Sequence, residues 1–450
     1  MSPSTLVIDR SVPRADRPVR PGVAPSLSVL PCPEVPLVTG ESVRYANFDY
    51  AASAPCVRAA AAAVADILPG YSAVHRGAGW PSQRCSRAYE DARAEVKRFI
   101  GAREDDHVVF TRNTTESLNL LARCLPADCR VVVFSSEHHA NLLPWRNPVQ
   151  VPIPDSPAGA VRSIADTLAV LGDEHPVLVA VTGASNVTGE LFPIDEIARV
   201  ARRFGARLLI DAAQLAPHRP IAIERIGADY VAFSGHKLYA PFGIGVLAGR
   251  SDWLDRADPH LYGGGASALV GEATGDVTWR TGPARHEGGS PNVIGAVALA
   301  AVCRELSPAW PQVIAHEETL RDRLVRGLTR VEGVRQLHLF GPDAPRVATV
   351  AFTIDGLDAG LVAAALSAEY GIGVRDGLFC AHPLTRRLVR LQRGRGDTGQ
   401  AVRASIGVGT RTDDVDRLVA AVAELAGSGP AWRYGVVEGR MAPVDDPRPE

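Results

Sequence analysis

The chain has 450 residues, of which 46% are hydrophobic and 22% charged, with a formal net charge of −2 at pH 7. That balance is typical of a soluble globular protein with enough length for one long or two ordinary domains. The small net charge gives no reason to expect a nucleic acid or an anionic membrane as partner.

Neither a membrane anchor nor a metal or disulfide framework is indicated. No apolar run reaches the roughly 18–20 residues that span a bilayer, and the longest, Val293 to Cys303, is typical of a buried Ala-rich helix. The first 22 residues lack an apolar signal core, so we expect a cytoplasmic protein. Seven cysteines without CxxC pairs or metal-ligand spacing predict no metal site.

Residues 1–40 are aperiodic and rich in Pro and Arg, which predicts a flexible N-terminal arm. From 41 to 308, short apolar runs alternate with helix-period segments, as in an α/β domain with a mostly parallel sheet. The expected strands are Val108–Thr111, Val131–Ser135, Leu178–Thr182, Arg207–Ile210, Tyr230–Phe233 and Gly245–Leu247, and the clearest helix is Asp195–Phe204. We expect the first residues of this large domain to pack against the domain that follows.

From about Ala309 the pattern changes. A helix, the strand Val347–Thr353, the helix Leu361–Tyr370, another strand and the helix Asp413–Ala426 predict a smaller α+β domain over 309–426. The Pro-rich residues 427–450 read as a flexible C-terminal tail.

Polar residues follow the expected strands, at the edge where function gathers in open α/β sheets. Thr114 and Thr115 fit either plain N-caps or a phosphate cradle at a helix N-terminus. The loop that holds His138 is either solvated or catalytic. Asp211 closes an apolar strand, where a carboxylate is costly to bury without a cationic partner. The next strand delivers Lys237 to the same edge.

Together these side chains fit an aldehyde cofactor with a pyridine ring. A desolvated lysine can hold such a cofactor as an imine. An aspartate beside the pyridine nitrogen keeps it protonated, and the ring then draws electrons. Hydroxyls and helix-terminal amides hold a phosphate, and a histidine ring stacks on the cofactor and moves protons.

The motifs at these positions resemble those of the class V, fold-type-I enzymes that depend on pyridoxal 5′-phosphate (PLP), within them the cysteine desulfurase and selenocysteine lyase group. The resemblance runs from about Asn47 to Ala426. It rests on Asn47-Phe48-Asp49-Tyr50-Ala51-Ala52, His75-Arg76-Gly77, Phe110 to Glu116, Glu137-His138-His139-Ala140-Asn141, Ser185-Asn186-Val187-Thr188-Gly189, Asp211-Ala212-Ala213-Gln214, Ser234-Gly235-His236-Lys237, Arg285 to Asn292 and Arg403-Ala404-Ser405.

The resemblance implies a large PLP-binding domain, a smaller C-terminal domain and a role for each matching residue. Lys237 is expected to form the Schiff base, Asp211 to meet the pyridine nitrogen and His138 to stack on the ring. The phosphate is expected to meet Thr114, Thr115, Ser234 and His236, and the phenolic side of the ring Asn186 and Gln214. Ser290 would reach the phosphate of a partner subunit, which implies a homodimer with shared active sites. Arg403 would grip the carboxylate of a small amino-acid substrate, with Asn47, Asp49 and Arg375 also on the substrate side.

Cys380 lies in register with the family's persulfide-forming cysteine, although a buried structural thiol is the default reading of one cysteine. The sequence departs from the family's pattern in two places that bear on the identity of the substrate. Leu378 and Phe379 replace a pair of histidines, and the longer stretch after Cys380 is basic over 386–395. That stretch is either a solvated face or a docking surface for an acidic sulfur acceptor or an anionic substrate.

The implied function is a cysteine desulfurase that converts L-cysteine to L-alanine with a persulfide on Cys380, in a dedicated biosynthetic pathway and with a protein as sulfur acceptor. The alternatives on the same scaffold are a C–S β-lyase, a selenocysteine lyase, an epimerase and an aminotransferase. A catalytically inactive binding protein is a third class, which the intact Lys237, Asp211, His138 and Arg403 argue against.

Overall fold

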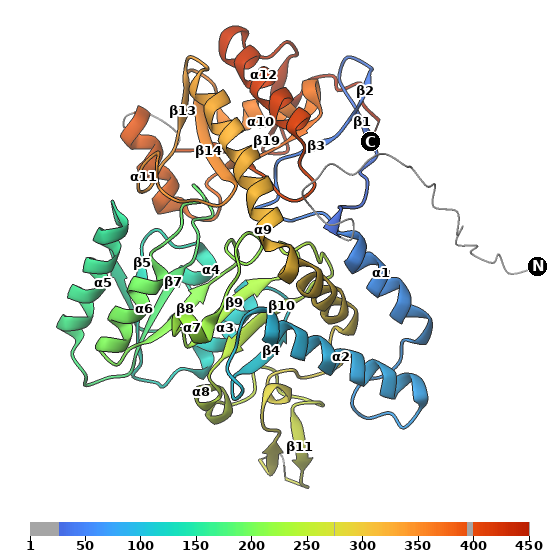
Figure 1. Ribbon diagram of the computed structural model, residues 1–450, viewed down its shortest axis with the longest axis vertical. Helices are drawn as coiled ribbons and strands as arrows, with labels where there is room; N and C mark the ends of the chain where they lie inside the picture. The colour runs from blue at the N-terminus through green and yellow to red at the C-terminus, as the bar shows by residue number, and fades with distance from the viewer. Residues whose placement is uncertain (1–26, 274, 394–398, 450) are drawn as a thin grey trace, which may run out of the picture.

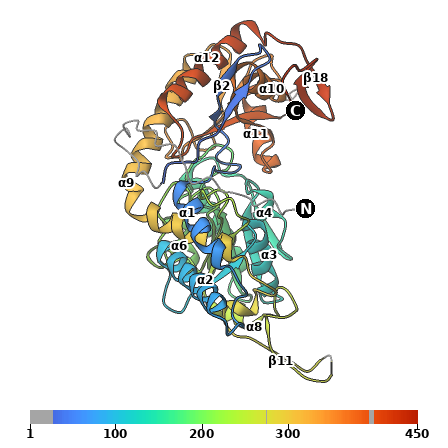
Figure 2. The same cartoon turned by 90° about the vertical axis from the view of Figure 1, so that its right-hand side faces the viewer.

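A computed structural model describes residues 27–273, 275–393 and 399–449, and it contains two bodies built around separate sheets (Figures 1 and 2). The larger sheet has seven strands in the order β4-β10-β9-β8-β7-β5-β6. Its strands are β4 His107–Thr111, β5 Arg130–Phe134, β6 Pro148–Val151, β7 Val177–Thr182, β8 Arg207–Asp211, β9 Tyr230–Ser234 and β10 Gly245–Gly249. Neighbours from β9 to β6 are parallel, whereas β10 is antiparallel to both of its neighbours.

Helices cover both faces of this sheet. They are α1 Arg58–Ile67, α2 Trp80–Phe99, α3 Thr114–Cys124, α4 His139–Leu142, α5 Pro157–Leu171, α6 Ile194–Arg203, α7 Ile223–Ile226 and α8 Ser251–Arg256, with 3₁₀ turns η2 Leu68–Gly70 and η3 Pro283–Arg285. In β5, Val132 and Phe134 belong to one hydrophobic cluster and Val131 and Val133 to another. Burial on both faces explains why the expected strands are continuous apolar runs, and each is present with its ends shifted by at most two residues.

The smaller body has a four-stranded antiparallel sheet in the order β13-β14-β17-β16. Its elements are β13 Val334–Gln336, β14 Thr349–Ile354, α10 Ala359–Tyr370, β15 Ile372–Gly373, β16 Arg375–Gly377, α11 His382–Arg393, β17 Ala401–Ser405 and α12 Thr412–Ser428. Strand β3 Ala46–Asn47 pairs in parallel with β15, and Phe48 lies in the core of this body. The chain's early residues therefore pack against the second body, as expected.

One long helix, α9 Val293–Thr329, belongs to both bodies and runs through the predicted boundary at 308. Within the described residues it is the one helix long and apolar enough to cross a membrane, but 67% of that apolar window is buried inside the protein. Pro308 and Pro311 lie within it. Its burial identifies it as a core helix.

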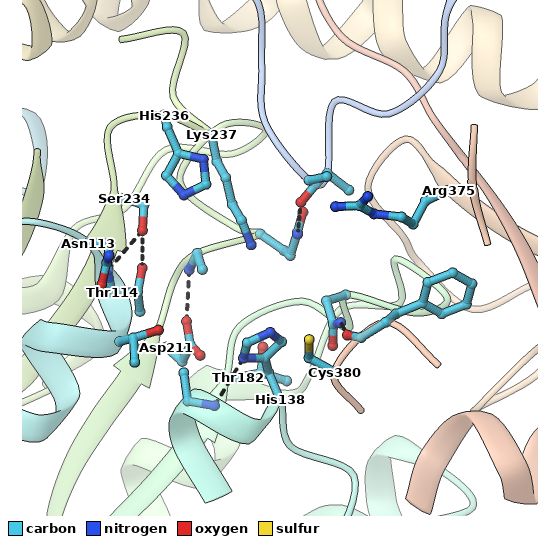
Figure 3. Close-up of a pocket in the computed structure, with 18 of the residues that line it drawn as sticks. Asn113, Thr114, His138, Thr182, Asp211, Ser234, His236, Lys237, Arg375 and Cys380 are labelled. Atoms are coloured by element: carbon cyan, nitrogen blue, oxygen red, sulfur yellow. Dashed lines mark hydrogen bonds between the residues drawn. The ribbon is translucent and has the colours of Figure 1, made fainter. Parts of the chain in front are cut away.

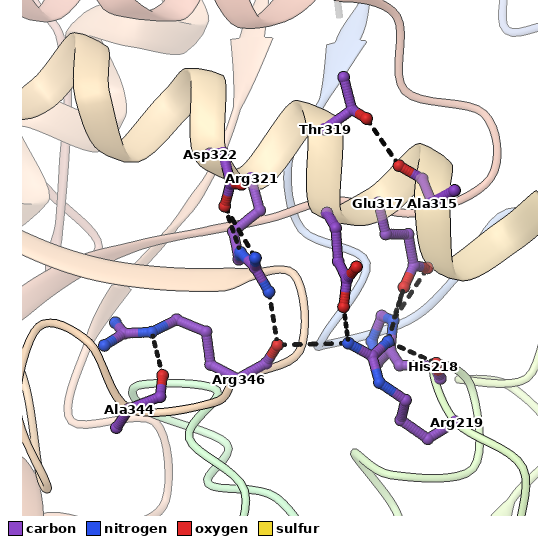
Figure 4. A network of polar contacts seen from close by, with 10 residues as sticks. His218, Arg219, Ala315, Glu317, Thr319, Arg321, Asp322, Ala344 and Arg346 are labelled. Carbon is purple, nitrogen blue, oxygen red and sulfur yellow. Dashed lines mark hydrogen bonds and ion pairs between the residues drawn. The ribbon is translucent and has the colours of Figure 1, made fainter.

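A polar network joins α9 to both bodies (Figure 4). His218 of the large body lies 3.0 Å from both carboxylate oxygens of Glu317, which is fully buried. Arg219 donates to Glu318 at 2.9 Å, and Arg321 donates at 2.8 Å to the backbone oxygen of Arg346 in the small body. These contacts fix the orientation of α9 where the two bodies meet.

Both predicted flexible ends are partly wrong. Residues 1–26 lie outside the described residues, but within the expected N-terminal arm Leu27 is fully buried and β1 Glu34–Pro36 pairs with β2 Ser42–Arg44. The expected C-terminal tail forms a hairpin of β18 Tyr434–Val437 and β19 Arg440–Pro443. Tyr434 and the Trp432 amide both donate to Glu369 on α10, which anchors the hairpin. A further hairpin, β11 Ser267–Val270 with β12 Val277–Trp279, projects from the large body.

Candidate active site

A cavity of about 280 Å³ lies between the two bodies, at the carboxyl ends of the parallel strands (Figure 3). It brings together most of the residues that the sequence singled out. They are Thr114, Thr115, His138, Asn186, Asp211, Gln214, Ser234, His236, Lys237, Arg375, Cys380 and Arg403. Asn47 and Ser290 do not line it.

Lys237 follows β9 through a turn and extends into the cavity (Figure 3). Burial lowers its pKa to about 8, with a further decrease from Arg403, while Asp211 and Cys380 act in the opposite direction. A lysine with that pKa has a substantial neutral fraction near neutral pH, which is the form that attacks a carbonyl.

Asp211 ends β8 and is 3% exposed. One carboxylate oxygen accepts a hydrogen bond from the Ala213 amide at 2.9 Å, and the other has no hydrogen-bond donor among the described residues. Burial raises the pKa of Asp211, while the Ala213 amide and Lys237 lower it. The carboxylate is thus held on one side and available on the side that faces the cavity.

The opposite end of the cavity is built for an anion. Asn113, not a threonine, caps α3, since its side chain accepts from the Glu116 amide at 3.0 Å. Thr114 and Thr115 are therefore the first helical residues and not its caps. The Thr114 amide and hydroxyl lie 2.8 and 2.6 Å from the Ser234 hydroxyl, which places two hydroxyls at the N-terminus of an eleven-residue helix. A side chain at Gly245 would come within 2.5 Å of the Asn113 backbone, so only glycine permits this approach.

His138 precedes α4, and its Nδ1 accepts a hydrogen bond from the Ala140 amide at 3.0 Å. Burial lowers the pKa of His138 to about 4, and the nearby Lys237 and His139 lower it further. The imidazole is therefore neutral at physiological pH, with its proton on Nε2.

Glu137 lies behind this site, and reasoning from local patterns missed it. It is fully buried and accepts hydrogen bonds from Asn141 Nδ2 at 2.9 Å and the Thr182 amide at 3.1 Å. Burial and nearby Asp211 raise its pKa to about 8. The motif Glu137–Asn141 contains this residue and was the one sequence feature that could have identified it. Within that motif, however, only His138 receives a role from the sequence.

On the substrate side, Arg403 of β17 is 3% exposed and donates from Nη1 to the Asn186 backbone oxygen at 2.7 Å. Asp49 accepts from Arg403 Nη2 at 3.4 Å and lies 3.7 Å from Nε of Arg375, so one carboxylate bridges two arginines. Arg403 Nε is buried without a partner. Burial lowers the pKa of Arg403 to about 10, and Arg375 lowers it further. Asn47 stands behind this group, where its side chain accepts from the Asp49 amide.

Cys380 is exposed on the loop between β16 and α11, where it lines the cavity. Phe379 and Cys380 have φ angles of 52° and 53°, in the left-handed region. Two hydrogen bonds to backbone oxygens hold this conformation. The His139 backbone amide donates to the Cys380 oxygen at 2.8 Å, and the Asn186 side chain donates from Nδ2 to the Phe379 oxygen at 2.7 Å. Strain of this kind persists only where surrounding contacts fix it. The structure therefore rejects the reading of Cys380 as a buried structural thiol.

Asn186 and Gln214 both use their amide nitrogens on backbone oxygens, those of Phe379 and Ala51. Ser290 is exposed and lines a second cavity of about 780 Å³ together with His75, Arg76 and Arg280. Within one chain it therefore contributes nothing to the Lys237 site.

The sequence model of the aminotransferase class-V family matches residues 46–418. The chain belongs to that family. A cysteine desulfurase of Dickeya dadantii is 38% identical to this chain over 368 residues, which cover 78% of this chain and 85% of the relative. A cysteine desulfurase of Klebsiella pneumoniae is 35% identical over 402 residues, 86% of this chain and 94% of the relative.

Two solved structures agree with this assignment. The cysteine desulfurase CsdA of Escherichia coli has a TM-score of 0.71 at 32% identity, covering 84% of this chain and 94% of its own. The apo cysteine desulfurase of Thermococcus onnurineus has a TM-score of 0.75 at 31% identity, covering 85% and 94%. The prediction of a class V enzyme with an α/β fold and a mostly parallel sheet is thereby confirmed, and the family is one that uses PLP.

Proposed function

We propose that the protein is a PLP-dependent cysteine desulfurase that converts L-cysteine to L-alanine and receives the sulfur on Cys380. The observation that carries this proposal is the exposed Cys380 thiol, which lines the same cavity as Lys237 and Arg403. A lyase of the same fold needs the lysine and the arginine but no thiol.

The residues of the cavity fit PLP. The hydroxyls of Thr114 and Ser234 at the start of α3 suit a phosphate, and the free oxygen of Asp211 suits a protonated pyridine nitrogen. Lys237 would hold the aldehyde carbon, and His138 would lie against the ring. When bound, PLP supplies an electron sink for the bonds of the substrate's α-carbon.

Arg403 binds the substrate's carboxylate in this proposal. Its buried Nε lacks a partner, and Nη2 makes only a long contact with Asp49, so a carboxylate can bind both nitrogens side by side. Asp49 would then keep Arg375 as its remaining partner.

Lys237 and His138 have different tasks in proton transfer. Lys237, with a pKa of about 8, can both accept and release a proton near neutral pH. His138 stays neutral and can donate from Nε2, since Nδ1 is already an acceptor. The Cys380 thiolate forms a bond to the sulfur of the substrate while the substrate's C–S bond breaks. The carbon fragment keeps that electron pair, gains a proton and leaves as L-alanine.

The test is incubation of the purified protein with L-cysteine and a reducing thiol, with separate assays for alanine, sulfide and pyruvate. Alanine and sulfide in equal amounts are expected. Pyruvate with ammonia would replace this proposal with a C–S β-lyase, and a turnover confined to selenocysteine would indicate the lyase for that substrate.

We also propose a homodimer with shared active sites. It is supported by Ser290, which resembles a phosphate-binding position of the family yet is exposed and outside the Lys237 cavity of its own chain. Sedimentation is expected to show a dimer, and Ser290→Ala is expected to weaken PLP binding without changing that dimer. A fully active monomer would contradict the proposal.

A further inference from the structure

Tyr239 lies two residues after Lys237, and its backbone adopts a conformation that tyrosine rarely takes. Its φ angle is 57°, in the left-handed region, and the residue is 1% exposed. A bulky residue with a positive φ angle is an outlier that persists only where surrounding contacts fix it. The contacts of Tyr239 therefore indicate what this strained turn holds in place.

The turn that holds Lys237 is fixed within the large body through its backbone. The His236 oxygen accepts a hydrogen bond from the Ala54 amide at 2.8 Å, and the Tyr239 oxygen accepts from the Val57 amide at 3.4 Å. Both bonds use main-chain groups alone. They do not require a tyrosine at position 239, so the side chain has to be explained by something else.

The Tyr239 hydroxyl reaches the segment that follows β17 of the small body. It accepts a hydrogen bond from the Val408 amide at 3.2 Å, and both residues are buried. Val408 comes three residues after the end of β17, the strand that contains Arg403. Burial raises the pKa of Tyr239 well above its ordinary value, and the nearby Glu317 and Tyr50 raise it further, so the hydroxyl stays neutral. One hydrogen bond thus joins the turn of the reacting amine to the strand of the substrate-side arginine.

Close packing around this hydrogen bond leaves the hydroxyl little freedom to move. The rings of Tyr239 and Tyr50 meet edge to face, with their centroids 6.3 Å apart. Gly407 lies against both rings, because a side-chain carbon there would come within 2.3 Å of Tyr50 and 2.9 Å of the Tyr239 hydroxyl. Tyr50 itself follows Asp49, whose carboxylate accepts from Arg403 at 3.4 Å. A second route therefore connects Tyr239 with the same arginine.

We infer that Tyr239 is a positioning residue that sets the separation between Lys237 and Arg403 across the cavity. The inference rests on the proposed function, in which the amine holds the cofactor and the guanidinium binds the substrate's carboxylate. Both groups must meet one small amino acid, so a shift of the strand with Arg403 relative to the Lys237 turn weakens the binding of that amino acid. A structural role alone would predict a less stable protein whose binding site is unchanged.

Tyr230 provides a matched control, because it is also a buried tyrosine whose hydroxyl accepts a hydrogen bond. It begins β9, the strand that ends three residues before Lys237, and it accepts from Arg207 at 3.0 Å. Tyr230 does not line the cavity, which lies at the other end of this strand, roughly 13 Å away. Phenylalanine at position 230 or 239 keeps the ring and removes one hydrogen-bond acceptor, so both variants should be less stable than the wild type.

The test compares the wild type, Tyr239→Phe and Tyr230→Phe as PLP-loaded enzymes, with L-alanine as the probe. L-Alanine carries the amino and carboxylate groups of the substrate, and its binding is followed by the absorbance of the bound cofactor without desulfuration. We expect Tyr239→Phe to raise the dissociation constant of L-alanine and the KM for L-cysteine about fivefold each, with a smaller change in kcat. Tyr230→Phe should keep both constants within about twofold of the wild type.

Urea titrations check that each variant is folded and measure how much stability it has lost. The expected result is a loss of stability in both variants, with weaker L-alanine binding in Tyr239→Phe alone. Unchanged L-alanine binding in Tyr239→Phe, equal weakening in Tyr230→Phe, or no binding of L-alanine by the wild type would overturn the positioning role. Absence of alanine formation from L-cysteine would refute the proposed function alone, because L-alanine binding is measured without that reaction.

Discussion

The two sides of the cavity are built differently. On one side, Asp211, Ser234 and Lys237 stand at or just beyond the ends of strands that are buried on both faces. On the other, Cys380 sits on an exposed loop with left-handed backbone at two successive residues. The rigid side holds groups that must keep one position relative to a cofactor. Under the proposed function, the loop side presents a thiol that must be reached both by the substrate and from solvent.

The largest effect is expected from removing the lysine of the rigid side. Lys237→Ala should abolish turnover, a loss of at least about 10³-fold, because no other described amine lines the cavity. The visible absorbance of the bound cofactor should change with it, and a spectrum together with an alanine assay checks both. Retained turnover would mean that the rigid side does not contain the reacting amine.

Asp211→Ala tests whether the rigid side also sets the electronics of the cofactor. Without the carboxylate a pyridine nitrogen loses its proton more easily, so turnover should fall by roughly 10²-fold or more while the folded state persists. Asp211→Glu is the control that keeps the charge. Comparable turnover in the wild type and the alanine variant would show that Asp211 is not the partner of the ring.

Phe379→Ala tests the loop side. The Phe379 ring centroid lies 5.1 Å from the guanidinium carbon of Arg403, and the side chain is 9% exposed. Loss of this contact, worth about 1 kcal/mol, should raise KM for L-cysteine roughly fivefold with a smaller change in kcat. Leu378→Ala, at a neighbour that does not line the cavity, is the control. An unchanged KM in Phe379→Ala would show that the ring does not position Arg403.

Glu137→Gln is expected to have the smallest effect on turnover, and its main consequence is a change in how stability depends on pH. Burial and Asp211 raise the pKa of Glu137 to about 8, above the ordinary value of 4.5. The folded state therefore binds the proton more tightly, and this contribution is complete below pH 4.5 and is lost as the pH rises toward 8. Wild-type unfolding free energy should fall by up to about 1.4 kcal/mol per pH unit across that window relative to Glu137→Gln. Parallel curves in urea titrations between pH 5 and 9 would contradict this.

The strand ends could be predicted from sequence because local patterns determine them. A continuous apolar run followed by a polar residue places Asp211 and Lys237 at one edge of a parallel sheet before any contact is known. The resemblance placed Asp49 on the substrate side, but local patterns could not show that its carboxylate bridges two arginines. That bridge depends on contacts with Arg375 and Arg403, residues more than 300 positions away that only the tertiary fold brings near.

The C-terminal hairpin shows a different limit. Glu438 and Gly439 both have positive φ angles, which is the signature of a tight hairpin turn between β18 and β19. The Pro-rich residues that follow dominated the composition and suggested flexibility. What orders the segment is Glu369 on α10, whose carboxylate accepts from Trp432 and Tyr434. A distant carboxylate of this kind leaves no trace in the local sequence.

The most direct test of the difference between the two sides is the location of the transferred sulfur. The PLP-loaded enzyme is treated with L-cysteine in the absence of any acceptor thiol, digested without reductant and analysed by mass spectrometry, beside Cys380→Ala and Cys56→Ala. We predict one added sulfur atom on the peptide that contains Cys380 in the wild type and in Cys56→Ala. Cys380→Ala should still bind L-cysteine through Lys237 and Arg403 but carry no sulfur and release no alanine. Wild-type alanine formation by Cys380→Ala, or sulfur on another cysteine in its place, would contradict the assignment of the loop thiol as the acceptor.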